Sequence, residues 1–303
     1  MKKLNYKIFF SDLIRAFRGD GFFRKFTPIL RERSSFPFTK VEYGRSKSDN
    51  ESGGRQLKIW CTNDYLNMSH DDDVIDEMVS VIRRVGTGSG GTRNISGTTP
   101  YHQKLEKTLA EFHNKEGALI FNSAYLANQT SIWTVCKALN DICVFSDSLN
   151  HASLIQGIKN SNSECKIFKH NDIEGIKKVI KTNLRKFGHP NIFSIIVEPY
   201  NHTKAIPCEY KFLKEIRKLC NKYKIILNYD EVYTGGSKTG TLIYFMRYRD
   251  ICPDILTTSK SLGGGKASIA ALSLIHISEP TRPERIGYGV VGVEKKKGGG
   301  GGG

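Results

Sequence analysis

The stretch Ile225-Ile226-Leu227-Asn228-Tyr229-Asp230-Glu231-Val232 is an apolar run that ends in two acidic residues. Thirty residues after Asp230 the chain reads Ser259-Lys260-Ser261-Leu262-Gly263-Gly264-Gly265, directly behind the strand-like segment Asp254–Thr258. Continuous apolar runs are typical of buried parallel strands, and open α/β sheets bind ligands beyond the carboxyl ends of their strands. We therefore expect Asp230 and Lys260 on the same rim of one sheet.

Strand and helix patterns alternate through the rest of the chain. Strands are predicted over 56–61, 117–121, 142–146 and 192–197, and helices over 73–84, 101–113, 124–138, near Leu154 and over 212–223. This alternation predicts an α/β fold with a mostly parallel sheet and helices on both faces. No internal repeat is visible.

The two ends of the chain differ from its middle. Residues 1–55 are polar and basic, and we expect an N-terminal arm and loop with an amphipathic helix over Tyr6–Arg18. Residues 56–271 form the predicted large domain. The letters LSLIHISEPTR at 272–282 resemble a translated sequencing adapter, and the last six residues are all glycine. We therefore interpret 272–303 as a non-native tail and expect a small C-terminal domain to be missing.

Composition narrows the classes of function. The 303 residues carry a net charge of +16, but the lysines are scattered and no ribonucleoprotein motif occurs, so nucleic acid is not a predicted partner. A basic surface does suit an anionic substrate such as a coenzyme A ester. The seven cysteines include no C-x-x-C pair, so neither zinc nor disulfides are expected.

The same inventory bears on location. No apolar run is long enough to span a membrane. Reduced thiols favour the cytoplasm. The mitochondrial matrix is the alternative because the basic N-terminal stretch could be a transit peptide, although Asp12 and Asp20 weaken that interpretation.

Asp230 and Lys260 together suit pyridoxal 5'-phosphate (PLP). This cofactor needs a lysine amine that forms an imine with its aldehyde, and a carboxylate that keeps its ring nitrogen protonated. Taken singly, the two residues would also fit a strand-end acid and a surface lysine. Lys266 is a rival amine that lies beyond the glycines. The Gly86-x-Gly88-x-x-Gly91 pattern follows a predicted helix instead of a strand, so it does not indicate a dinucleotide site.

Three longer motifs add a resemblance to a known family. They are Ile59-Trp60-Cys61-Thr62-Asn63-Asp64-Tyr65-Leu66, Gly90-Gly91-Thr92-Arg93-Asn94-Ile95-Ser96-Gly97-Thr98 and Asn150-His151-Ala152-Ser153-Leu154-Ile155-Gln156-Gly157-Ile158. Through them, residues 17–163 resemble the α-oxoamine synthases, a family of fold-type I PLP enzymes, and are most similar to 5-aminolevulinate synthases. Residues 195–271 are more similar to class III aminotransferases.

The resemblance implies roles for particular residues. His151 would stack on the cofactor ring, and Ser123, Ala124 and Tyr125 would lie by its phosphate at a helix N-terminus, where free N–H groups bind anions. Val232 and Tyr233 would also contact the cofactor, with Tyr233 in the place of a histidine that usually bonds the ring hydroxyl. The expected amino-acid and acyl-CoA site is lined by Asn63, Thr92, Arg93, Asn94 and Ile95.

The resemblance also implies a reaction. Lys260 would remove the α-proton of glycine, and condensation with succinyl-CoA, with release of CoA and carbon dioxide, would give 5-aminolevulinate, the first step of tetrapyrrole and heme biosynthesis. The alternatives are a class III-like aminotransferase and an inactive truncated fragment. Enzymes of this type resemble one another in forming homodimers, so a homodimer is expected by analogy.

Overall fold

A computed structural model of the chain describes residues 5–21, 23, 26, 28–41, 55–139, 142–264 and 267–274. The chain divides into two units, Met1–Thr62 and Asn63–Gly303. Part of the predicted loop, Ser46–Gly54, and the rival lysine at 266 lie outside the described residues.

The described residues of the first unit form one helix and a two-stranded sheet. Helix α1 (Tyr6–Gly19) begins behind Asn5, whose side chain accepts a hydrogen bond from the Ile8 N–H at 3.3 Å. This confirms the helix that the amphipathic pattern predicts. Strand β1 (Phe38–Val41) pairs antiparallel with β2 (Arg55–Lys58), so the strand predicted over 56–61 ends three residues earlier than expected.

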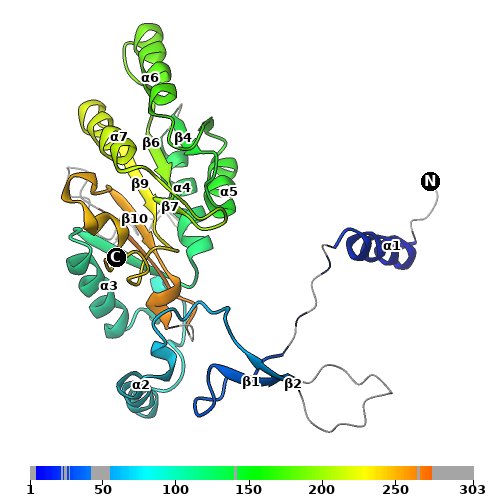
Figure 1. Ribbon diagram of the computed structural model, residues 1–303. Coiled ribbons are helices and arrows are strands. Elements are labelled where there is room, and N and C mark those ends of the chain that lie inside the picture. The colour runs from blue at the N-terminus through cyan, green and yellow to red at the C-terminus, as the bar shows by residue number, and fades with distance from the viewer. Residues whose placement is uncertain are drawn as a thin grey trace, which may run out of the picture. The chain divides into compact units, whose positions relative to one another are not determined.

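The second unit is built on a seven-stranded sheet with the order β3-β11-β10-β9-β6-β4-β5 (Figure 1). Every strand runs parallel to the others except β11, which is antiparallel to both of its neighbours. The predicted mostly parallel sheet is therefore confirmed. The strands are β3 (Gly117–Phe121), β4 (Cys143–Asp147), β5 (Glu164–Phe168), β6 (Ser194–Val197), β9 (Ile226–Asp230), β10 (Ile255–Thr258) and β11 (Ala270–Leu274).

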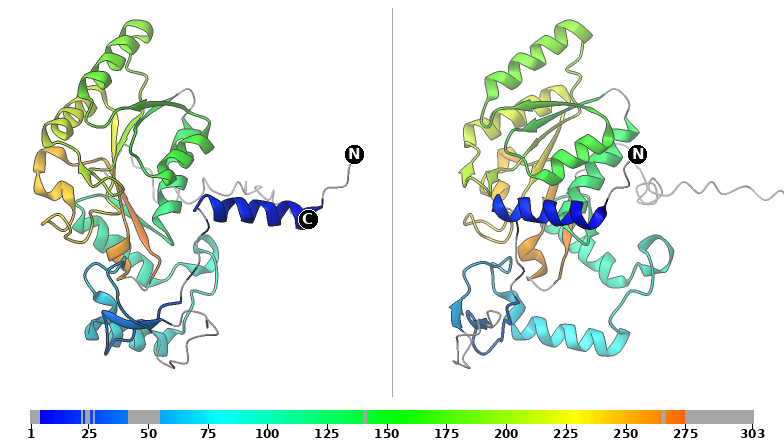
Figure 2. Two further views of the ribbon diagram at one scale, coloured as in Figure 1. Left: turned by 45° about the vertical axis from the view of Figure 1, so that its right-hand side comes forward. Right: turned by 90° about the vertical axis from the view of Figure 1, so that its right-hand side faces the viewer.

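Helices cover both faces of this sheet (Figure 2). They are α3 (Pro100–Phe112), α4 (Ala124–Ala138), α5 (Ala152–Ser161), α6 (Ile173–Phe187) and α7 (Tyr210–Tyr223). Helix α2 (Asp72–Val85) has no buried residue and lies away from the sheet. A short hairpin joins β7 (Tyr200–Asn201) to β8 (Ile206–Pro207), and short helical turns occupy Met68–His70, Arg93–Gly97, Tyr244–Arg247, Arg249–Ile251 and Lys260–Gly263. Among the described residues, no helix has both the length and the apolar character needed to cross a membrane.

The core lies in two layers, one on each side of the sheet. Successive side chains of a strand point to opposite faces. Accordingly, Phe145 and Ile195 pack with residues of α6 and α7, whereas their neighbours Val144 and Ile196 pack with residues of α4 and α5. Strands that are buried on both faces need apolar residues at consecutive positions, which explains the continuous runs in the sequence.

Strand β11 lies inside the sheet, between β3 and β10. It includes Leu272, Ser273 and Leu274, and the Ser273 hydroxyl is 2.8 Å from the His113 Nδ1 atom. The fold was expected to end at Ala271, but these three residues of the predicted tail are strand residues, because their backbone groups pair with strands on both sides. Residues 275–303 lie outside the described part of the chain.

Candidate active site

Asp230 and Lys260 occupy the same end of two neighbouring strands. Asp230 is the last residue of β9, and β10 runs parallel beside it with Thr257 opposite Asp230. Lys260 follows β10 by two residues and has a backbone φ of +51°. The left-handed region is uncommon for residues other than glycine, and such backbone conformations concentrate at functional sites. The strand geometry therefore places these two residues at the rim that the sequence predicts.

The Asp230 carboxylate is buried and held by two donors. The Asn128 side-chain amide donates to its Oδ2 atom at 2.8 Å, and the Val232 N–H donates to its Oδ1 atom at 3.0 Å. Asn128 also donates to the Ser153 hydroxyl at 3.1 Å, which ties α4, α5 and β9 together. Burial raises the pKa of Asp230, because a charge removed from water is unfavourable. A cationic group beside the Asp230 carboxylate would lower this pKa again and so stabilise the ionised form.

Two histidines and a buried glutamate lie beside this pair. His151 caps α5, where its Nδ1 atom accepts a hydrogen bond from the Ser153 N–H at 3.2 Å. Its ring centroid is 5.5 Å from that of His202, and the His202 Nδ1 atom is 3.0 Å from a carboxylate oxygen of Glu198. Burial, and next the charge of Asp230, raises the pKa of Glu198 to about 8. Burial therefore favours the protonated form of this carboxyl group.

Four buried polar atoms near this pair have no hydrogen-bond partner within the described part of the chain. They are the Asn128 Oδ1, Glu198 Oε1, Thr257 Oγ1 and Thr258 Oγ1 atoms. Buried polar groups without partners are costly and need an explanation. A bound polar molecule at this rim would supply the missing donors.

The raised pKa of Glu198 gives a pH-dependent stability. Between its unfolded value of 4.5 and about 8, the unfolded chain releases a proton that the folded protein keeps, so stability falls as pH rises. Glu198→Gln removes this effect. From pH 5 to pH 8, the cofactor-free variant should therefore gain stability relative to wild type, on the order of a few kcal/mol at most. Urea unfolding at the two pH values measures this. Glu174→Gln, at an exposed residue, is the control, and parallel pH curves for Glu198→Gln and wild type would contradict the assignment.

Lys260 and Tyr233 are in contact. The Lys260 Nζ atom lies 5.0 Å from the centroid of the Tyr233 ring. Burial lowers the pKa of Lys260, while Asp230 and Glu198 oppose this shift. Tyr233 in turn stacks on Tyr200 with ring centroids 6.2 Å apart. The phenol expected at the cofactor is thus held next to the reactive amine.

The predicted phosphate-binding segment lies at the start of α4. Ser123 caps this helix, and its hydroxyl accepts a hydrogen bond from the Leu126 N–H at 3.2 Å. Ala124 is the first helical residue, and the Tyr125 ring meets the His151 ring edge to face at 6.3 Å. The helix N-terminus and the predicted stacking histidine therefore lie side by side.

The predicted substrate loop is ordered by its own contacts. The Thr92 hydroxyl donates to the Asn94 side chain at 2.8 Å, and Arg93 forms an ion pair with Glu106 of α3. The guanidinium of Arg93 is therefore committed to a carboxylate of the protein. Ile95 is 83% exposed. No hydrogen bond, ion pair or ring contact recorded for Asn63 or for this loop, within the described residues, reaches Asp230 or Lys260, so the structure does not join the loop to the pair.

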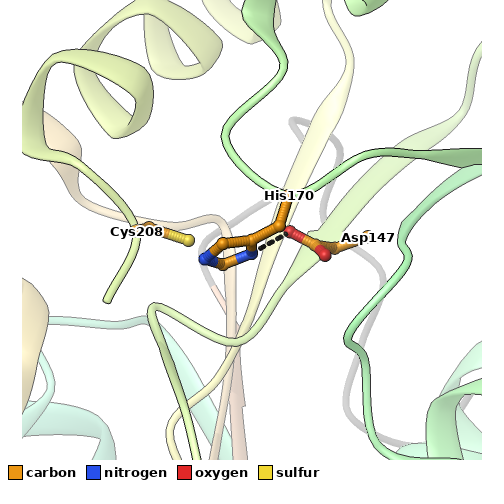
Figure 3. A group of neighbouring side chains, drawn as sticks. All are labelled: Asp147, His170 and Cys208. Atoms are coloured by element: carbon orange, nitrogen blue, oxygen red, sulfur yellow. Dashed lines mark hydrogen bonds and ion pairs between the residues drawn. The ribbon is translucent and has the colours of Figure 1, made fainter. Parts of the chain in front are cut away.

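A separate group of side chains could hold a metal ion: Asp147, His170 and Cys208 (Figure 3). Hydrogen bonds also explain why these three side chains lie together. The Asp147 Oδ2 atom is 2.8 Å from the His170 Nδ1 atom, and the Cys208 thiol donates to the Glu198 carbonyl at 3.5 Å. Burial raises the pKa of Cys208 well above its usual value, which disfavours the thiolate that binds metals. All seven cysteines are free, as the sequence predicts.

Comparison with known proteins identifies the family. A family model described as aminotransferase class I and II matches residues 56–263. The chain belongs to this family. Its members depend on PLP, so PLP is the cofactor, as predicted. The match runs through both halves of the chain, including the part that resembles class III aminotransferases.

Curated relatives of this family member are 5-aminolevulinate synthases. The enzyme of Rhodobacter capsulatus is 34% identical over 77% of this chain and 54% of its own length. The erythroid-specific mitochondrial enzyme of Opsanus tau is 37% identical over 77% of this chain and 38% of its own length. The chain thus spans about half the length of the first relative and less of the second. The resemblance to α-oxoamine synthases is confirmed.

A solved structure supports the fold. Serine palmitoyltransferase from S. paucimobilis, which contains a PLP–myriocin aldimine, superposes with a TM-score of 0.70. It is 22% identical, and the superposition covers 91% of this chain and 67% of that one. The fold-type I assignment is therefore confirmed.

Three residues of the site were missed by sequence reasoning: Asn128, Glu198 and His202. The sequence gives no signal for Asn128, because its burial beside Ala127 on α4 is a property of the fold. Glu198 directly follows an apolar strand, as Asp230 does, which is the position from which ligands are bound. His202 lies between two strands of two residues each, which are too short to leave a pattern.

Proposed function

We propose that this chain catalyses the PLP-dependent condensation of glycine with succinyl-CoA, as a 5-aminolevulinate synthase-like acyltransferase. The observation that supports this most is the Asp230–Lys260 pair at one sheet rim, in a chain 34–37% identical to those synthases. We also propose a homodimer in the cytoplasm, and a large domain that follows an N-terminal arm and extends from residue 56 through the end of β11 at Leu274.

The described residues fit the cofactor. Asp230 offers a buried carboxylate to the ring nitrogen, and His151 offers a ring for stacking. The first N–H groups of α4, behind Ser123, have no helical partner and suit a phosphate. Asn128 and Glu198 each present an unpartnered oxygen. These five residues, with Lys260 as the amine, would hold PLP.

Each residue of the site would have a separate role in the reaction. PLP, when bound, supplies an electron sink for the α-carbon of the substrate. Burial makes the Lys260 amine easier to deprotonate, and this amine removes the α-proton as a general base. Asp230 places a negative charge beside the ring nitrogen, where Asn128 and the Val232 N–H fix its orientation. The Tyr233 phenol would bond the ring hydroxyl in place of histidine.

One observation favours a second candidate, an aminotransferase. Tyr233 occupies the position that is usually histidine in the synthases, and the second half of the chain resembles class III aminotransferases. In that reaction Lys260 would also remove the α-proton, but it would then deliver this proton to the cofactor carbon. No acyl donor would take part.

The two reactions give different products. For a synthase, free CoA thiol is expected only when glycine and succinyl-CoA are both present, and 5-aminolevulinate is expected in equal amount. For an aminotransferase, pyridoxamine phosphate would form from an amino acid without any CoA ester. Thiol titration and mass spectrometry of PLP-loaded protein measure both. Formation of pyridoxamine phosphate without CoA release would reject the synthase proposal.

A further inference from the structure

Lys238 is held between two phenol rings beside the active-site lysine. Its Nζ atom lies 3.1 Å from the centroid of the Tyr65 ring and 3.6 Å from that of the Tyr233 ring. The two rings meet edge to face, with an interplanar angle of 82°. An ammonium group is attracted to aromatic faces, and two of them restrict it to one place.

The charge of Lys238 is not neutralised by the protein. Within the described part of the chain it forms no ion pair, and Tyr233 contacts the Lys260 amine from 5.0 Å as well. Burial, and then the positive charge of Lys260, lowers the pKa of Lys238 to about 8. The nearby acids have other partners, because Asp230 accepts from Asn128 and Glu198 contacts His202. The amines of Lys238 and Lys260 therefore both contact the Tyr233 ring, and among the described residues no carboxylate forms an ion pair with Lys238.

We propose that Lys238, with Tyr65 and Tyr233, forms a binding site for a carboxylate group of a substrate. The inference rests on the proposed function, since it takes Lys260 as the reacting centre. Lys238 is exposed, so a carboxylate can reach its ammonium group and pair with it, and the position next to Lys260 would orient the substrate. The carboxylate could belong to the amino acid or to the far end of the acyl group of succinyl-CoA.

Calorimetry on PLP-loaded protein tests this without turnover. The ligands, each added singly, are glycine, succinyl-CoA and butyryl-CoA, whose acyl chain has the same length but no carboxylate. Lys238→Met removes the charge and keeps most of the stem, whereas Lys238→Arg keeps a charge. The matched control is Lys222→Met on α7, since the Lys222 Nζ atom lies 5.1 Å from the centroid of the Tyr223 ring, and no other contact of Lys222 is found among the described residues.

Lys238→Met should weaken one carboxylate ligand at least about tenfold, the usual size of a lost charged hydrogen bond. A loss confined to glycine assigns the amino-acid carboxylate, and a loss for succinyl-CoA but not for butyryl-CoA assigns the acyl carboxylate. Lys238→Arg should keep most of the affinity. Affinities within twofold of wild type for all three ligands, or an equal loss for butyryl-CoA, would overturn the proposal.

The test also separates this site from the proposed reaction. Lys238→Met should retain the absorbance of bound cofactor, and its loss would overturn the carboxylate assignment because Lys238 would then support PLP itself. Wild-type protein that shows the Lys238-dependent affinity but releases no CoA would support the carboxylate site and contradict the synthase reaction.

Discussion

Lys260→Ala is expected to abolish the covalent link between the protein and PLP. An imine requires a primary amine, and within the described part of the chain Lys260 is the amine that follows the strand next to Asp230. Borohydride reduction of PLP-loaded protein, followed by peptide mass spectrometry, should find the cofactor on Lys260 in wild type. The variant should show no labelled peptide and no absorbance of the imine.

Two other lysines serve as controls for this experiment. Lys266→Ala tests the rival that the sequence offers, and Lys238→Ala tests the amine that shares the Tyr233 ring with Lys260. Both variants should keep the label on Lys260. A labelled peptide that contains Lys266 or Lys238 in wild-type protein would show that the cofactor lysine has been assigned wrongly.

Asp230→Asn should lower the turnover number for CoA release on the order of 10²–10³-fold. Asparagine keeps the size of the side chain but has one acceptor oxygen, so it can accept from Asn128 or from Val232 but not from both, and it lacks the charge that keeps the ring nitrogen protonated. The cofactor should also bind more weakly. Steady-state thiol release and a PLP titration measure the two effects.

Asp172→Asn is the matched control for this substitution. Asp172 caps α6 and accepts a hydrogen bond from the Gly175 N–H at 2.8 Å, far from any chemistry proposed for the chain. Asparagine caps helices about as well as aspartate, so the replacement should cost well under about 1 kcal/mol of stability and leave turnover unchanged. An Asp230→Asn enzyme with turnover within threefold of wild type would exclude the electrostatic role.

Much of the fold could be predicted because its strands are buried on both faces. The strand over 117–121 and the helix over 124–138 have the predicted bounds, since apolar runs and turn residues mark them. Strand β5 escaped prediction because it lies at the edge of the sheet, where Glu164, Cys165 and Ile167 are exposed and no apolar run is needed. Tertiary pairing, which the local sequence does not encode, forms this strand.

Some residues of the site could be predicted from the sequence, and others could not. Asp230 and Lys260 could be paired from sequence because both directly follow strands, and parallel neighbours bring such residues to one rim. Asn128 reaches Asp230 across 102 residues, and that approach depends on how α4 packs beneath the rim. Lys238 lies in a polar loop where nothing in the sequence distinguishes it from the other lysines.

The placement of β11 sets an order for folding. Strand β3 is made early in synthesis, yet within the described residues its sole strand partner is β11, which is made some 150 residues later. Until β11 inserts, β3 and β10 each present an unpaired edge, and exposed edges invite pairing with other chains. During synthesis, the exposed edges of β3 and β10 would therefore be open to aggregation until β11 pairs with both.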